Sequence, residues 1–231
     1  MPSPYDMLPL VAYVRGVAKE TGALHLPESL TDTPLDALTE TDLAALCAAG
    51  KAAGLKLYRF KHTHSDLPRV RRVLGFLRGI SFDSLLDVGS GRGVFLFPFL
   101  SAFPWVSVTA ADILDYRVAF LNTLTRGGME RLSAVQADIC TQPFGENCFD
   151  VVTLLEVLEH IPDVAAAIAA AVRIARQFVI VSVPSKPDDN PEHIHLLTKE
   201  KLTALFYAAG CTALSFDGVN GHLIAIARTG D

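Results

Sequence analysis

Apolar and polar positions divide most of the chain into two kinds of alternating segment. From Phe82 onward, short apolar runs alternate with longer segments in which apolar residues recur every three or four positions. The first kind is typical of buried strands and the second of helices. The pattern predicts strands at 82–88, 106–111, 132–137, 149–155 and 178–183, and helices at 94–103, 115–126, 163–176 and 198–209.

Two further apolar runs, at 211–217 and 222–228, flank the turn residues Asp217-Gly218 and Asn220-Gly221 and predict a closing strand pair. Strands that alternate with helices indicate a parallel sheet with helices on both faces. The closing pair has no long helix between its strands, so one strand should enter antiparallel. The sequence therefore predicts an α/β fold with a doubly wound, mainly parallel seven-stranded sheet and an antiparallel closing strand.

The first part of the chain has a helical pattern without strands. Helices are expected at 8–18 and 36–53, and the second contains the capping-box pattern Thr39-x-x-Asp42. A further helix is indicated by the helical spacing of Leu67, Val70, Leu74 and Leu77. In a sheet of this kind the ligand crevice is expected at the carboxyl ends of the parallel strands. We expect residues 1–66 to form an N-terminal helical cap over this crevice and residues 67–231 to form the main domain.

Composition narrows the class of protein. Half of the 231 residues are hydrophobic, yet no apolar run reaches the roughly 18–20 residues that span a bilayer. The N-terminus lacks the basic and apolar regions of a signal peptide. The four cysteines show no C-x-x-C spacing and fit reduced, buried thiols, which favours a cytoplasmic protein: Cys47, Cys140, Cys148 and Cys211.

Charge is unevenly distributed, although the net charge of −5 does not suggest a nucleic-acid partner. Residues 28–50 contain five acids and no Lys or Arg, whereas residues 51–80 contain eight cations and one acid. Solvated faces of two adjacent helices explain this pattern best. Because Tyr58 and Phe60 interleave with the cations, a patch for nucleic acid or an acidic substrate stays an alternative.

The segment Leu85-Leu86-Asp87-Val88-Gly89-Ser90-Gly91-Arg92-Gly93-Val94-Phe95 carries the most specific signal. It is a buried strand that ends in a glycine-rich turn before a helix. Glycines let the backbone turn sharply and approach a ligand closely. The dinucleotide fingerprint G-x-G-x-x-G/A does not fit, because Val94 occupies the position of its third small residue.

The pattern Asp-x-Gly-x-Gly-x-Gly resembles motif I of the class I S-adenosylmethionine-dependent methyltransferases. Asp112, at the end of the second strand, lies near the spacing of about 20 residues expected of a ribose-binding acid. The segments 134–139 and 149–163 resemble the strand-3 and strand-4 motifs of the same family. The resemblance covers roughly residues 67–228, and no comparable match was found for residues 1–66.

The resemblance implies S-adenosyl-L-methionine as cofactor and assigns roles to individual residues. The glycine turn would hold the methionine and ribose part, Asp112 the ribose diol, and Asp138 with Ile139 the adenine. The implied cofactor-binding residues are Asp87, Gly89, Ser90, Gly91, Gly93, Asp112, Ile113, Asp138, Ile139 and Leu155.

The residues that contact the methyl acceptor should follow the fourth and fifth predicted strands, at 149–155 and 178–183. The candidate catalytic residues are Glu156, His160 and His193. A helical turn would place Glu156, Glu159 and His160 on one face. Such a cluster with a later His resembles the metal site of the small-RNA 3′-end 2′-O-methyltransferases. Similar sequences also occur in metal-free small-molecule methyltransferases, so no metal is assigned. The alternate pair His62 and His64 cannot close a metal site alone and fits a loop or the cap.

The favoured hypothesis is a methyltransferase that moves a methyl group from the sulfonium of S-adenosylmethionine to a small-molecule acceptor by in-line displacement. The protein must then align the reactants and exclude water, and it needs a base only if the acceptor loses a proton. Alternatives are an RNA methyltransferase, whose binding would weaken steeply with salt, a non-catalytic cofactor-binding protein and, more distantly, a nicotinamide oxidoreductase. No membrane partner is expected.

Overall fold

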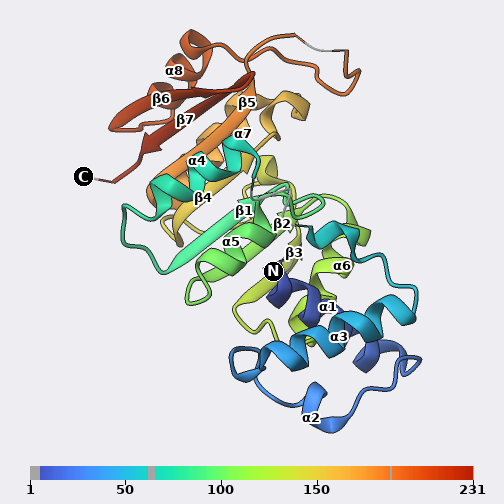
Figure 1. The fold of residues 1–231 in the computed structure, drawn as a ribbon. Coiled ribbons are helices and arrows are strands. Elements are labelled where there is room, and N and C mark those ends of the chain that lie inside the picture. The colour runs from blue at the N-terminus through green and yellow to red at the C-terminus, as the bar shows by residue number, and fades with distance from the viewer. Residues whose placement is uncertain (1–5, 62–65, 188, 231) are drawn as a thin grey trace.

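A mixed sheet forms the centre of the computed structural model, which describes residues 6–61, 66–187 and 189–230 (Figure 1). Within these residues the sheet has seven strands in the order β3-β2-β1-β4-β5-β7-β6. The strands are β1 (Ser84–Val88), β2 (Ser107–Asp112), β3 (Leu132–Gln136), β4 (Phe149–Leu155), β5 (Ala175–Pro184), β6 (Ala213–Val219) and β7 (His222–Arg228).

The strand directions confirm the predicted fold class. The pairs β1–β2, β2–β3, β1–β4 and β4–β5 are parallel, whereas β7 is antiparallel to both β5 and β6. One reversed strand therefore closes the sheet, as the short connection between the last two apolar runs predicts.

Helices cover both faces of the sheet and share its hydrophobic core. The α-helices are α1 (Met7–Thr21), α2 (Glu28–Thr31), α3 (Glu40–Ala52), α4 (Pro68–Leu77), α5 (Leu96–Ala102), α6 (Asp115–Arg126), α7 (Val164–Ile174) and α8 (Lys199–Ala208). Short 3₁₀ turns are η1 (Leu35–Ala37), η2 (Leu57–Phe60), η4 (Ile139–Thr141) and η5 (Leu158–His160).

Strand alternation divides the core into two layers. Leu85, Val151 and Ile180 point to the face that packs against α1, α4, α5 and α6. Their neighbours Leu86 and Val152 point to the face covered by α7 and α8. Because successive side chains of a strand point to opposite faces, near-continuous apolar strands such as these require helices on both sides.

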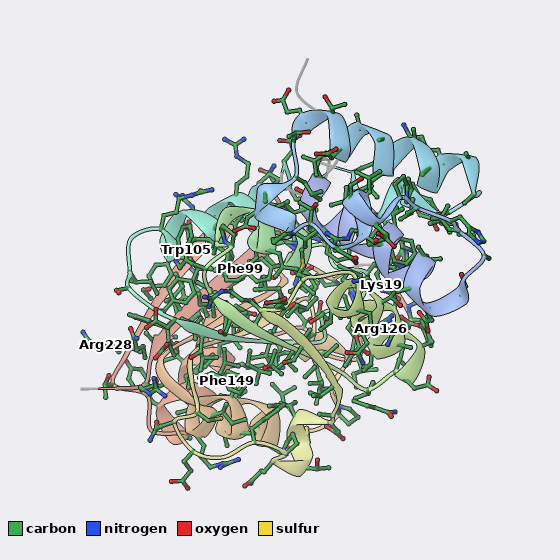
Figure 2. The ribbon with its side chains drawn as sticks, turned by 90° about the horizontal axis from the view of Figure 1, so that it is seen from below. Lys19, Phe99, Trp105, Arg126, Phe149 and Arg228 are labelled. Atoms are coloured by element: carbon green, nitrogen blue, oxygen red, sulfur yellow. The ribbon has the colours of Figure 1, made fainter. Side chains whose placement is uncertain are left out.

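Aromatic side chains fill much of the first layer. The rings of Phe99 and Phe103 stack with centroids 4.9 Å apart, and Phe103 meets Trp105 edge-on at 5.8 Å. Figure 2 labels Phe99 and Trp105 in this group. The apolar segment after the glycine turn packs in the core, where Phe95, Leu96 and Phe97 are buried.

The N-terminal helix α1 packs closely on α6. Leu10, Val11 and Val14 are fully buried and belong to the same core cluster as the strands. At the end of this contact Glu20 forms an ion pair with Arg126 at 2.9 Å. Figure 2 labels Arg126 and Lys19, the residue before Glu20. The division of the chain after residue 66 stays a prediction.

Local differences from the expected elements follow from caps and turns. Thr39 caps α3, and its capping box with Asp42 is confirmed. The helix predicted at 36–53 therefore begins later, at Glu40. The helix expected at 163–176 ends at Ile174, because the chain enters β5 directly at Ala175. The turn residues of segment 27–34 predict a loop, but Glu28–Thr31 within it form the short helix α2.

The four cysteines carry free thiols. Cys47 and Cys211 are buried as expected, whereas Cys140 is half-buried and Cys148, in the turn before β4, is exposed. Among the described residues, no helix combines the length and the apolar character that crossing a bilayer requires.

Candidate functional site

A crevice of about 810 Å³ lies at the carboxyl ends of β1, β2 and β4. This is the edge of an open parallel sheet at which ligands bind. Its lining includes nine of the ten residues expected to bind the cofactor, Gly93 being the exception. Among the described residues, the lining begins at Arg69 in α4 and includes none from α1 to η2.

The glycine turn has the backbone conformation that only glycine adopts readily. Gly89, Gly91 and Gly93 have φ angles of 67°, 57° and 79°. The space beside each glycine differs. A Cβ on Gly93 would lie 2.4 Å from the ring of Phe97, whereas a Cβ on Gly91 would meet nothing closer than 3.5 Å. Gly93 therefore allows the turn to pack on α5, and Gly91 leaves backbone facing the crevice.

Asp112, at the end of β2, connects the glycine turn to the start of α6. Its side chain is buried, and one oxygen, Oδ2, accepts a hydrogen bond from the Gly91 N–H at 3.0 Å. The other oxygen, Oδ1, accepts from the Leu114 N–H at 3.0 Å. Arg117 contacts Oδ2 at 3.3 Å. Burial lowers the pKa of Arg117, but the Asp112 carboxylate and Tyr116 together outweigh this effect and raise the pKa above its ordinary value.

Asp87 lies at the end of β1, beneath the turn. Burial raises its pKa to about 6, against hydrogen bonds from Thr153 and Ser90 that lower it, and the nearby Asp112 raises it further. The Thr153 hydroxyl donates to Oδ1 at 2.7 Å, from the paired strand β4. A carboxyl group with such a pKa is sensitive to any charge placed in the crevice.

The residues expected to contact adenine line one part of the crevice. Asp138 caps η4 by accepting a hydrogen bond from the Cys140 N–H at 2.9 Å. Ile139 is buried, whereas Ile113 is 63% exposed. Leu155, at the end of β4, lines the same crevice. Apolar walls beside a carboxylate suit a flat ring with a polar edge.

Glu156 follows β4 in a left-handed conformation, with φ of 58°. Its carboxylate accepts a hydrogen bond from the Ser182 hydroxyl at 2.7 Å and contacts His222 Nδ1 at 2.9 Å. Left-handed backbone is uncommon for a residue with a Cβ and is found at functional sites. The expectation that one helical turn aligns Glu156 with Glu159 and His160 is wrong, because only Leu158–His160 form a 3₁₀ turn.

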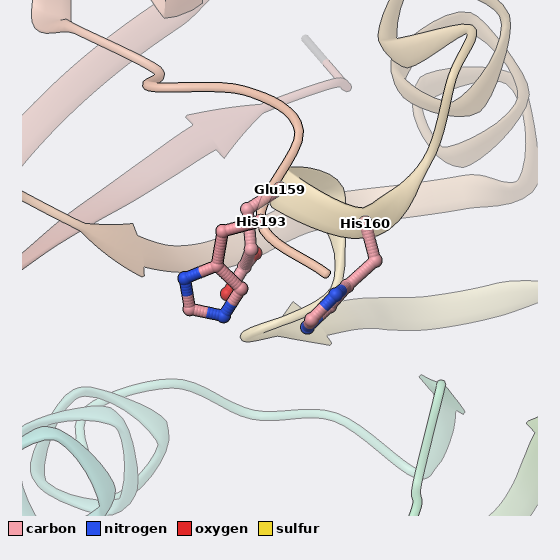
Figure 3. Close-up of side chains that lie close together, drawn as sticks. All are labelled: Glu159, His160 and His193. Atoms are coloured by element: carbon pink, nitrogen blue, oxygen red, sulfur yellow. The ribbon is translucent and has the colours of Figure 1, made fainter. Parts of the chain in front are cut away.

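Glu159, His160 and His193 gather beside the crevice. Each offers a potential ligand atom, and these atoms lie within 4.8 Å of one another. Figure 3 shows the three side chains projecting from η5 and from the loop after β5 into one space. His160 lines the crevice, whereas His193 is not among the lining residues and follows the lining residue Glu192 in the chain.

Sequence reasoning missed several residues of this site. Arg69 and Arg117 line the crevice, and Ser182 and His222 hold Glu156. Ser182, near the end of a parallel strand, could have been expected at this edge. The position of His222 depends on its register opposite Pro184 across β5 and β7, which no local pattern reveals.

The cations of residues 51–80 have separate surroundings. Arg72 pairs with Asp217 of β6 at 2.6 Å, and the Arg59 guanidinium lies 4.8 Å from the ring centre of Phe120. Arg69 lines the crevice and is half-buried. His62 and His64 lie outside the described residues.

Comparisons with known proteins agree with this geometry. Residues 86–181 match the family model described as "Methyltransferase domain". The ubiquinone biosynthesis O-methyltransferase of Nitrosomonas europaea is 34% identical over 122 residues, which are 51% of this chain and 50% of that protein. The chain thus spans about half the length of the curated relatives it matches.

Solved structures support the fold. The YcgJ protein from Bacillus subtilis has a TM-score of 0.55 at 20% identity, over 64% of this chain and 71% of its own. The magnesium protoporphyrin IX methyltransferase from Synechocystis PCC 6803, solved with S-adenosylhomocysteine (SAH), has a TM-score of 0.54 at 16% identity, over 69% and 81%. Residues 86–181 therefore resemble a methyltransferase domain, and the chain shares the fold of these solved structures.

Proposed function

We propose that the chain binds S-adenosylmethionine in the crevice and transfers its methyl group to a small-molecule acceptor. The observation that carries the proposal is the buried carboxylate of Asp112, which lies at the crevice and is tied to the glycine turn through Gly91. The same arrangement supports a nucleoside ligand with two adjacent hydroxyls.

The crevice fits this cofactor. Its volume of about 810 Å³ lies within the usual range for small-molecule sites. A carboxylate has about four acceptor positions, so Asp112 can hold the turn and still accept hydrogen bonds from a ribose. Gly91 leaves its backbone accessible, and Ile139 offers an apolar surface to the base. When bound, the cofactor supplies a methyl carbon made electrophilic by a sulfonium.

Residues that follow β4 support an acceptor site on this side of the crevice. Glu156 and His160 line the crevice, and Glu156 is fixed by Ser182 and His222. A fixed carboxylate can orient a hydroxyl and accept its proton. The names of the curated relatives specify O-methyltransferases, which supports a hydroxyl acceptor. A small-molecule acceptor and a location in the cytoplasm belong to the same proposal.

Calorimetric titration with SAH tests the cofactor assignment. The Asp112→Asn variant removes the charge but keeps the size of the side chain. Hydrogen bonds to a charged group contribute about 1.5–3 kcal/mol, and each 1.4 kcal/mol is tenfold in affinity. We therefore expect Asp112→Asn to weaken SAH binding by about 10- to 100-fold. Asp115→Asn, an exposed position at the start of α6, should leave the affinity unchanged.

Two controls give the result its meaning. Circular dichroism and thermal melting must show that Asp112→Asn is folded, because Asp112 also holds Gly91 and Leu114. NAD should not bind. Binding of NAD in place of SAH would refute the proposal. With SAH binding established, turnover of methyl-labelled cofactor on a panel of small hydroxyl compounds tests the acceptor class.

A further inference from the structure

The cluster of Glu159, His160 and His193 has the composition of a metal-binding site. Two imidazoles and one carboxylate bind zinc with a coordination position left for water or a substrate, and the same set binds other first-row ions. The potential ligand atoms lie within 4.8 Å of one another. Metal–nitrogen bonds are about 2.0–2.1 Å, so small side-chain rotations would bring all three onto one ion.

The backbone brings these residues together from distant parts of the chain. The Ile194 N–H donates to the Glu159 carbonyl at 2.9 Å, which attaches the loop after β5 to η5. In the same loop the His193 N–H donates to the Asn190 carbonyl at 3.0 Å. The imidazole rings of His160 and His193 consequently lie 4.8 Å apart between centroids, at 69° to each other. The loop thus adds one imidazole to the pair on η5.

The hydrogen bond of His160 leaves one of its nitrogens suited to metal binding. Its Nδ1 lies 2.9 Å from the carbonyl oxygen of Glu192. A carbonyl can only accept, so Nδ1 must carry the proton and, in the neutral ring, Nε2 carries the lone pair. A histidine that binds a metal typically donates its other N–H to a carbonyl or carboxylate. The Glu192 carbonyl fills this supporting role.

We propose that Glu159, His160 and His193 bind a divalent first-row transition ion such as Zn²⁺ at the acceptor side of the crevice. The ligand types select such ions over Mg²⁺, which prefers oxygen ligands and water. Glu159 is fully buried, and a cation beside a buried carboxylate stabilises its charge. Glu156 is not part of this set, because its carboxylate points to Ser182 and His222.

The site gives the proposed function a more specific acceptor. Because His160 and Glu192 line the crevice, a remaining coordination position of the ion would face a molecule bound there. Acceptors with two neighbouring oxygens would then be favoured over isolated hydroxyls. This preference rests on the proposed methyl transfer, whereas metal binding itself does not.

Metal titration of the full chain, first freed of metal with a chelator, tests the site. We expect one equivalent of Co²⁺ to give the visible absorption of a histidine-bound ion, and one equivalent of Zn²⁺ to displace it. Mg²⁺ should not compete at similar concentrations. His193→Asn and Glu159→Gln should each weaken Zn²⁺ binding, measured by calorimetry, by about tenfold or more.

Matched variants separate this site from other imidazoles. His195→Asn changes the next histidine of the same loop, whose ring contacts the Pro162 carbonyl at 3.3 Å, and should leave Zn²⁺ affinity within about twofold. The double variant His62→Asn/His64→Asn should also retain binding. Thermal melting confirms folding, and His193→Asn decides the outcome if the buried Glu159→Gln variant is unstable.

The proposal is overturned by failure to bind one equivalent of Zn²⁺, by unchanged affinity in His193→Asn, or by loss of binding in the His62/His64 double variant. None of these readouts uses cofactor or acceptor. A failed metal titration therefore leaves the SAH test intact, and the reverse also holds.

Discussion

The contact between α1 and α6 leaves no room for a side chain at residue 16. A Cβ on Gly16 would lie 1.8 Å from the carbonyl oxygen of Thr123 and 2.9 Å from its Cγ2. The nearest atom belongs to the backbone of α6, so no change of rotamer can relieve the overlap. Gly16→Ala must move the two helices apart and disturb the core layer that they share.

The expected loss of stability follows from two opposing effects. Alanine is favoured over glycine in a helix by about 1 kcal/mol. Overpacking costs typically about 1–3 kcal/mol, and an overlap with backbone belongs at the upper end. The net loss is on the order of 2 kcal/mol. For a chain of this length each kcal/mol shifts Tm by about 2–4 °C, so Tm should fall by about 4–8 °C.

Gly75 provides the matched control. It lies within α4, and a Cβ there would meet no atom within 4 Å. Gly75→Ala should therefore gain the helix preference alone and raise Tm by about 2–4 °C. Calorimetric melting and urea unfolding of both variants measure the difference. A Gly16→Ala protein that melts at or above the wild type would refute the close packing of α1 on α6.

Three further predictions concern the crevice and the glycine turn beside it. Because burial raises the pKa of Asp87 to about 6, well above the unfolded value of about 3.9, the folded state binds the extra proton between these values. The contribution of Asp87 to the free energy of unfolding should therefore fall by on the order of 1–3 kcal/mol as pH rises from about 4 to 6. Urea unfolding of Asp87→Asn should lack this pH-dependent contribution. Gly93→Ala should destabilise the fold by about 1–3 kcal/mol through contact with Phe97; an unchanged urea midpoint would contradict this. Glu156→Gln should lower turnover of a hydroxyl acceptor by about 100-fold or more with SAH affinity preserved, and full activity would exclude Glu156 as the base.

Most of the fold could be predicted because its signals are local. Strands such as Phe149–Leu155 are mostly apolar, and the helix Asp115–Arg126 closely follows the strand Ser107–Asp112. The gathering of the candidate cofactor-binding residues at one crevice could be predicted for a related reason. Asp112 and Asp138 follow strands whose carboxyl ends meet at one edge of a parallel sheet, so their proximity follows from topology alone.

Other features depend on contacts between distant residues. The role of Gly93 could not be separated from that of Gly91 without the position of the Phe97 ring. The close packing of α1 on α6 depends on Gly16 meeting Thr123. Spacing alone suggested that Glu156 joins Glu159, but the left-handed backbone at Glu156 turns its side chain elsewhere.

The proposed cofactor half of the crevice and its proposed acceptor half therefore differ in how their geometry is fixed. The cofactor half is set by residues at the ends of neighbouring strands, such as Asp112. The acceptor half depends on distant segments, because Glu156 is held by His222 of β7 and Glu159 is attached to the loop after β5 through Ile194. Changes in β7 or in that loop can reshape the acceptor half without moving the glycine turn. We accordingly expect His222→Gln to alter turnover among hydroxyl acceptors while SAH affinity stays within about threefold, and a parallel loss of SAH binding would show that the two halves are not separable.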